Sequence, residues 1–236
     1  MDKIIYLSSG DLFKSEIEKV KGGYQIFRAR NLRDALIFLI NNPEVGAIIY
    51  TVASSSLIDK KTMEVFFHLN PLFPVIIAQK ETGKYDQTQL MEWNKNIILL
   101  GSIDELDNVL QSTQKNRRKY NRVDWPLFAT FYKNINSSTT ETGKILSLSA
   151  GGSYIQTTNF DMVDLNQPVY MEIHFRDFKF FVESTVVRIN KTLSSESLPP
   201  GFAVRFDNVS IATQTYINHI INDHLMMTLF KELDIK

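Results

Sequence analysis

The strongest constraint on the fold is a change in the pattern of apolar residues near residue 113. Before this point, short apolar runs alternate with amphipathic stretches of helical period. After it, strand-like runs follow one another with no helical stretch between them. Alternating strands and helices form α/β domains, whereas successive strands form all-β sandwiches or barrels. The chain of 236 residues is therefore predicted to form two domains, residues 1–112 and 113–236.

The first domain contains five short runs of almost purely apolar residues, as expected of strands covered on both faces. These runs are Ile4–Leu7, Tyr24–Phe27, Val45–Tyr50, Phe73–Ala78 and Ile97–Leu100. The stretches between them have helical spacing, and one helix is expected to begin after Ser102, a potential N-cap with Glu105 three residues later. Five strands alternating with five helices predict a doubly wound α/β domain with a parallel sheet.

The second domain is expected to be a small antiparallel barrel of six strands. The predicted strands are Pro126–Tyr132, Lys144–Leu148, Ser153–Thr157, Val169–Phe175, Phe178–Ile189 and Phe202–Phe206. A tight hairpin is expected at Arg176–Asp177, and a polar loop at 193–201. A final helix is predicted from Ile211 to Leu229, with an apolar stripe along one side.

The composition narrows the possible functions. There are no cysteines, so disulfides, zinc ribbons and thiol chemistry are excluded. The formal net charge is zero, so any anion site must be local, and a general nucleic-acid surface is not expected. The four histidines lack the spacing of a helical metal pair, and neither an enzyme motif nor a membrane span is found. We expect a non-enzymatic, cytoplasmic protein that binds no metal.

The five strand–helix units resemble the response-regulator receiver domain, but the residues of its phosphorylation site are missing. A working receiver needs acids after strand 1, an aspartate ending strand 3 and a lysine ending strand 5, which hold Mg²⁺ and the phosphoryl group. Here the corresponding segments read Ser8-Ser9-Gly10, Ile49-Tyr50-Thr51 and Leu100-Gly101, with Asp11 as the first acid. We expect a degenerate receiver-like domain that serves as a scaffold or interaction surface, without phosphotransfer.

Two short motifs lie at the start of the second domain. Arg118-Lys-Tyr-Asn-Arg122 is preceded by Arg117, and Ser147-Leu-Ser149-Ala-Gly151-Gly152 follows after one predicted strand. These segments resemble the Arg-x-x-x-Arg and Asp/Asn-x-Ser-x-x-Gly motifs of PilZ domains. The segment Gly201–Phe206 resembles the strand that closes the PilZ barrel. Ser147 departs from the pattern, because it replaces the acid or amide.

The resemblance implies a receptor for the second messenger cyclic di-GMP. It implies that Arg118 and Arg122 grip phosphate and guanine, that Ser147 and Ser149 read the guanine edge, and that Arg117 accompanies binding of two stacked ligands. Guanidinium groups suit this chemistry, because they bind phosphate and guanine bidentately and stack on purines. Gly151 and Gly152 permit close approach of the backbone. Binding would order the basic linker at the start of the second domain and change the arrangement of the two domains.

Other interpretations of these segments remain open. The PilZ fold would persist in a protein that no longer binds nucleotide and acts as a protein–protein adaptor. The basic residues 117–122 would also suit a solvated linker paired with acids on the preceding helix, or a small nucleic-acid patch around Tyr120. Met226, Met227 and Phe230 would either bind a partner or pack on the neighbouring domain.

Overall fold

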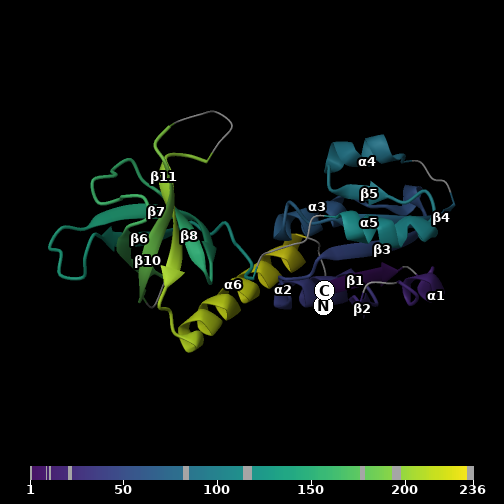
Figure 1. The fold of residues 1–236 in the computed structure, drawn as a ribbon, viewed down its shortest axis with the longest axis horizontal. Helices are drawn as coiled ribbons and strands as arrows, with labels where there is room; N and C mark the ends of the chain where they lie inside the picture. The colour runs from purple at the N-terminus through teal and green to yellow at the C-terminus, as the bar shows by residue number, and fades with distance from the viewer. Residues whose placement is uncertain are drawn as a thin grey trace. The chain divides into compact units, whose positions relative to one another are not determined.

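A computed structural model describes residues 2–8, 10, 12–20, 23–81, 85–113, 119–175, 179–192 and 198–232. The chain forms two compact units (Figure 1). One comprises residues 1–119 together with 224–236, and the other comprises residues 120–223. The domain boundary between residues 112 and 113 stays a prediction.

The first unit contains a five-stranded parallel sheet with strand order β2-β1-β3-β4-β5, one of the two common orders of doubly wound folds. Its strands are β1 (Lys3–Ser8), β2 (Gln25–Ala29), β3 (Ala47–Ser54), β4 (Val75–Glu81) and β5 (Ile97–Leu99). The parallel α/β arrangement agrees with the prediction. Whether the unit is related to receivers stays a prediction, as does the role of Asp11, which lies outside the described residues.

Four α-helices connect the strands of this sheet, and a fifth follows the last strand: α1 (Lys14–Ile17), α2 (Leu32–Asn41), α3 (Lys60–Leu69), α4 (Gln87–Trp93) and then α5 (Leu106–Ser112). Local side chains fix where three of them begin, because Asn31, Asp59 and Asp86 accept hydrogen bonds from the first-turn N–H groups of α2, α3 and α4. Ser102 also acts as a cap, but the turn it opens is the 3₁₀ segment Ile103–Glu105, and α5 follows it.

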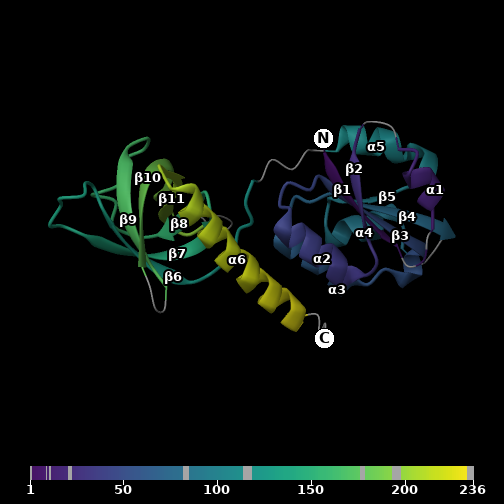
Figure 2. The same cartoon turned by 90° about the horizontal axis from the view of Figure 1, so that it is seen from below.

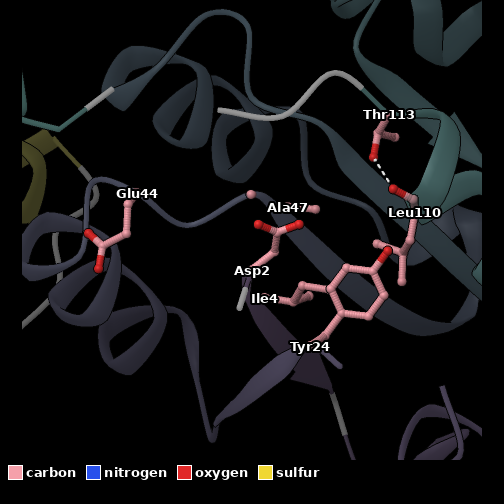
Figure 3. A pocket seen from close by; sticks show the side chains of 8 residues that line it. Asp2, Ile4, Tyr24, Glu44, Ala47, Leu110 and Thr113 are labelled. Atoms are coloured by element: carbon pink, nitrogen blue, oxygen red, sulfur yellow. Dashed lines mark hydrogen bonds between the residues drawn. The ribbon is translucent and has the colours of Figure 1, made fainter. Parts of the chain in front are cut away.

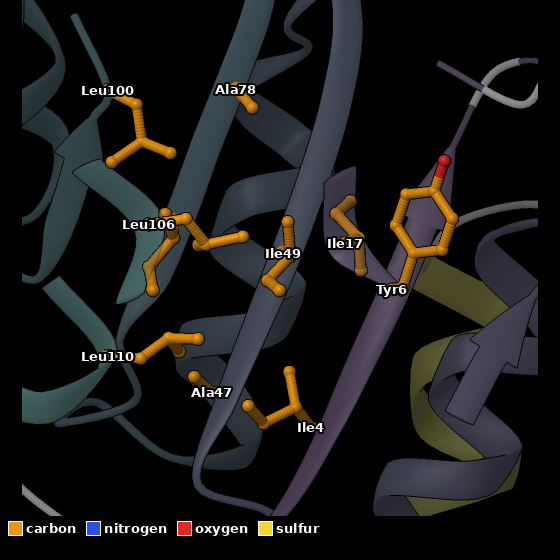
Figure 4. Packing of buried hydrophobic residues seen from close by; sticks show 10 residues of the cluster. Ile4, Tyr6, Ile17, Ala47, Ile49, Ala78, Leu100, Leu106 and Leu110 are labelled. Atoms are coloured by element: carbon orange, nitrogen blue, oxygen red, sulfur yellow. The ribbon is translucent and has the colours of Figure 1, made fainter. Parts of the chain in front are cut away.

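The helices cover both faces of the sheet, with α1 and α5 on one side and α2 and α3 on the other (Figure 2). On the α1/α5 side, alternate strand residues such as Ile4, Tyr6 and Ile49 pack with Leu106 and Leu110 of α5 (Figure 4). The intervening residues point to the opposite face because successive side chains of a strand alternate. Burial on both faces explains why these strands are continuous apolar runs in the sequence.

The second unit is a closed six-stranded barrel with strand order β10-β11-β8-β7-β6-β9, all neighbours being antiparallel. Its strands are β6 (Leu127–Tyr132), β7 (Glu141–Ser149), β8 (Gly152–Gln156), β9 (Pro168–His174), β10 (Lys179–Asn190) and β11 (Gly201–Asp207). The predicted barrel is confirmed. The expected hairpin at Arg176–Asp177 and residues 193–197 of the predicted loop lie outside the described residues.

The last helix, α6 (Ile211–Glu232), begins soon after β11 and extends three residues beyond its predicted end. Ser210 starts it, because its hydroxyl accepts a hydrogen bond from the N–H of Thr213 at 3.0 Å. Ile217, Ile221 and Leu225 are buried, as the apolar stripe predicted. None of the described helices is long and apolar enough to cross a membrane.

Candidate functional site

The end of the basic linker pairs with the strand that precedes the glycine turn. Val123 and Leu148 exchange two backbone hydrogen bonds, each 2.9 Å long, in an isolated antiparallel bridge. Leu148 stands between Ser147 and Ser149, and Val123 directly follows Arg122. Two motifs that are separated by 25 residues are thereby held at one edge of the barrel.

A second contact joins the same two segments. A Cβ atom added to Gly151 would lie 3.1 Å from the Tyr120 ring, so this ring rests against the turn. Tyr120 lies within the Arg118–Arg122 motif. The linker and the turn therefore meet at two points, Tyr120 with Gly151 and Val123 with Leu148. Arg122 lies between Tyr120 and Val123 in the chain, so its side chain projects from the barrel close to the turn.

The turn after β7 is stabilised by its own serine. The Ser149 hydroxyl donates to the carbonyl of Gly152 at 3.0 Å and accepts from the N–H of Gly151 at 3.3 Å. The side chain is buried, and the Gly151 carbonyl accepts a hydrogen bond from Phe206 of β11. Ser149 shapes the turn in this conformation, and the backbone of Gly151 and Gly152 forms its surface.

Ser147 reaches the outer face of the barrel through an irregularity in β7. The register shifts between Ile145 and Ser147, so that Ser147 lies opposite Tyr154. A strict two-residue alternation from buried Ile145 would have directed Ser147 into the core. The bulge instead places it on the outer wall, level with Ser149 and beside the linker.

Two further arginines lie on this wall. The strand pairing aligns Ser147 with Tyr154, Ala203 and then Arg188, and it aligns the Ser149–Gly152 pair with Arg205. Both arginine side chains are exposed. Arg205 donates to the Asp207 carboxylate at 3.0 Å. Because Asp207 offsets the charge of Arg205, Arg188 is the main source of positive charge on this wall.

Arg122 is exposed, and its guanidinium makes no hydrogen bond or ion pair within the part of the chain that the structure describes. Arg117 and Arg118 lie outside the described residues. Two acids near the start of the preceding helix, Asp104 and Glu105, form hydrogen bonds with their own neighbours. Asp104 accepts a hydrogen bond from the Ser102 hydroxyl, and Glu105 accepts one from the N–H of Gly101. Arg122 is therefore available to an anionic ligand.

Comparison with known families identifies the second unit. Residues 116–223 match the family model described as the PilZ domain. This part of the chain is a PilZ domain. The match spans the linker, the barrel and the first half of α6. It doesn't extend to the first unit, whose likeness to receivers stays a prediction.

Solved structures are similar to part of this chain at low identity. The inhibitor of motility MotI/DgrA of Bacillus subtilis is 17% identical over 46% of this chain and 51% of its own, with a TM-score of 0.39. The PilZ domain of Escherichia coli YcgR with c-di-GMP is 20% identical over 51% of this chain and 99% of its own, with a TM-score of 0.40. The chain thus spans about half of MotI/DgrA. A search of curated proteins gave no match.

The carboxyl edge of the parallel sheet, where doubly wound folds bind ligands, carries several neutral polar groups beside the exposed Lys80 and Glu81 that end β4. Gln79 accepts a hydrogen bond from the N–H of Ser55, and the Ser55 hydroxyl donates to the Tyr85 carbonyl. Burial, with a smaller effect of Asp59, raises the pKa of Tyr50, which therefore stays neutral. Within the described residues no group of three or more histidines and carboxylates is placed to hold a metal.

A pocket in the first unit lies at the opposite edge of this sheet, where β1 and β3 begin (Figure 3). Its lining includes the apolar Ile4 and Leu110 and the carboxylates of Asp2 and Glu44. Lys3 neutralises Glu44 through an ion pair of 2.5 Å. Among the described residues, this pocket has no basic side chain in its lining, whereas the wall beside the glycine turn carries arginines.

Proposed function

We propose that the PilZ domain binds cyclic di-GMP and that the protein is a signalling effector of this messenger. Arg118 and Arg122 hold the phosphates and guanines, Arg117 supports a second stacked ligand, and the ligand lies on the turn formed by residues 147–152. The observation that carries this proposal is the Val123–Leu148 bridge, because it holds Val123, the residue after Arg122, beside the turn. The family assignment of residues 116–223 supports the same ligand.

The chemistry of the wall supports this ligand over other anions. Guanidinium groups bind phosphate oxygens bidentately, and the two glycines allow the backbone to approach a planar base. Arg188 adds positive charge on the same face, where Asp207 offsets the charge of Arg205. Ser147 supplies a neutral hydroxyl where the family has an acid or amide, so we expect binding in the range of about 1–100 µM.

Calorimetric titration with cyclic di-GMP tests the proposal. Replacing Arg118 or Arg122 by alanine is expected to weaken binding by about 10- to 100-fold, because each removes a charged hydrogen bond worth about 1.5–3 kcal/mol. Arg30→Ala is the matched control, since Arg30 is an exposed arginine of the first unit. Its affinity should equal that of the wild type. Equal loss in all three variants, or no heat from the wild type at about 100 µM, would contradict the proposal.

A second candidate function is a protein–protein adaptor without nucleotide. An exposed aromatic face of the barrel favours it, because Phe128 of β6 is 58% exposed and Phe181 of β10 is 65% exposed. The strands β6 and β10 flank β9, and exposed aromatic side chains are common at protein interaction sites. Absence of nucleotide binding in the titration above would favour this candidate.

A further inference from the structure

A stripe of side-chain amides runs along one face of α6. Gln214, Asn218 and Asn222 follow one another at intervals of four residues, so they lie on the same side of the helix. Amides are unusual on a buried helix face, because each must find hydrogen-bond partners there. The partners of the first and last members are the two segments that meet at the candidate nucleotide site.

At one end of the stripe, α6 reaches the turn. The side-chain amide of Gln214 donates to the carbonyl of Ala150 at 3.4 Å. Ala150 is fully buried and lies between Ser149 and Gly151. The helix is itself fixed to the end of β11 by the Ser210 cap. This end of the amide stripe therefore contacts a rigid part of the barrel.

At the other end, α6 reaches the linker. Asn121 donates its side-chain N–H to the side-chain oxygen of Asn222 at 2.9 Å. The two residues are only 7% and 6% exposed, and they are 101 positions apart in the chain. A hydrogen bond shielded from water holds its partners strongly, because losing it leaves a buried polar group unsatisfied. Asn121 immediately precedes Arg122, so this bond fixes the backbone from which the Arg122 side chain projects.

Asn218, between these two contacts, has a buried side-chain oxygen without a hydrogen-bond partner among the described residues. This acceptor lies between the contact of Gln214 with the turn and the contact of Asn222 with Asn121.

We propose that Asn222 is a positioning residue for the nucleotide site, and that α6 holds the linker against the glycine turn through the Asn121–Asn222 bond. This inference rests on the proposed function, because it assigns the bond a role in binding cyclic di-GMP. Ligand binding and linker attachment are then linked: the factor by which the bond strengthens ligand binding is also the factor by which bound ligand strengthens the bond. The C-terminal helix is in this way part of the receptor.

Two measurements on the full chain test the role of Asn222. Asn222→Ala is expected to weaken binding of cyclic di-GMP by about 10-fold in calorimetry. In the absence of nucleotide, it is expected to speed hydrogen exchange of the backbone amides around Asn121 by a similar factor. Exchange in β9, for example at Ile173, should not change, because a general loss of stability would speed exchange there as well.

Two further variants serve as controls. Asn121→Ala should reproduce both effects, and the double variant should be no worse than either single one, since both remove the same bond. Thr215→Ala, at an exposed position of the same helix, should behave as the wild type. If hydrogen exchange around Asn121 is unchanged in Asn222→Ala, the inference is wrong, regardless of the nucleotide affinity of this variant. Failure of the wild type to bind cyclic di-GMP would overturn the nucleotide role and the proposed function together, and the exchange data would still decide whether the bond holds the linker.

Discussion

Replacing Phe202 by alanine is expected to lower the free energy of unfolding of the PilZ domain by about 3–5 kcal/mol. Phe202 is fully buried in β11 and lies edge-on to Phe131, with ring centroids 5.1 Å apart. Its strand neighbour Ile155 is also fully buried. Because the barrel is closed, the opposite wall cannot collapse easily into the space that the ring leaves.

The two tryptophans allow this loss to be measured in the barrel alone. Trp93 belongs to α4 of the first unit, whereas Trp125 packs edge-on against Phe175 in the barrel. Urea unfolding followed by fluorescence in a Trp93→Phe background therefore reports the barrel. Phe181→Ala is the matched control, since that ring is 65% exposed, and it should change stability by less than about 0.5 kcal/mol. Equal losses in the two variants would contradict the assignment of Phe202 to the core.

Alanine at Gly152 is expected to destabilise the barrel by about 3 kcal/mol, near the upper end of the usual cost of overpacking. Its Cβ would lie 2.2 Å from the carbonyl oxygen of Val204, which belongs to the neighbouring strand β11. A backbone atom can move away only if β8 and β11 separate. We expect urea unfolding of Gly152→Ala to show this loss, with weaker nucleotide binding as a consequence.

Gly151→Ala gives the contrasting result at the adjacent position. The new Cβ would touch only the Tyr120 ring, at 3.1 Å, and a side chain can yield more easily than a strand. Stability of the barrel should fall by less than about 1 kcal/mol. A stability loss as large as that of Gly152→Ala would show that the linker, and not only the strand pairing, supports the barrel.

The secondary structure of this protein follows closely from its sequence pattern. In the first unit, Ile4–Leu7 and Phe73–Ala78 are continuous apolar runs because helices cover both faces of the sheet. In the barrel, β9 alternates between buried Val169, Met171 and Ile173 and more exposed residues between them. The spacing of apolar residues shows which faces of a strand are buried, and it therefore locates the strands in the sequence.

Several features of the site couldn't be predicted in this way. Arg188 follows Val182, Ser184 and Val186 at even spacing, so alternation would have placed it in the core. The register shift between Val186 and Arg188 turns it to the outer wall. Arg205 was within reach of prediction, because it stands in the segment Gly201–Phe206 at an outward position. The single residues that form bulges leave no periodic signal in a sequence.

The contact between Asn121 and Asn222 is hidden for a different reason. The two residues are 101 positions apart, and Asn121 stands at a variable position of the Arg-x-x-x-Arg motif, which gives it no role. Asparagine is usually exposed, so a buried pair is known only from the fold. The roles of the motif residues in binding stay predictions, and Ser149 uses its hydroxyl inside the turn, a role that the motif alone does not reveal.

The central claim, that cyclic di-GMP lies on the glycine turn, is tested most directly by following glycine backbone amides during a nucleotide titration. Selective labelling is practical because the chain contains only ten glycines. The amide resonances of Gly151 and Gly152 should shift and saturate, whereas that of Gly143, which pairs with Ala129 elsewhere in the barrel, should stay in place. Unchanged resonances of Gly151 and Gly152 at about 100 µM nucleotide would contradict the account.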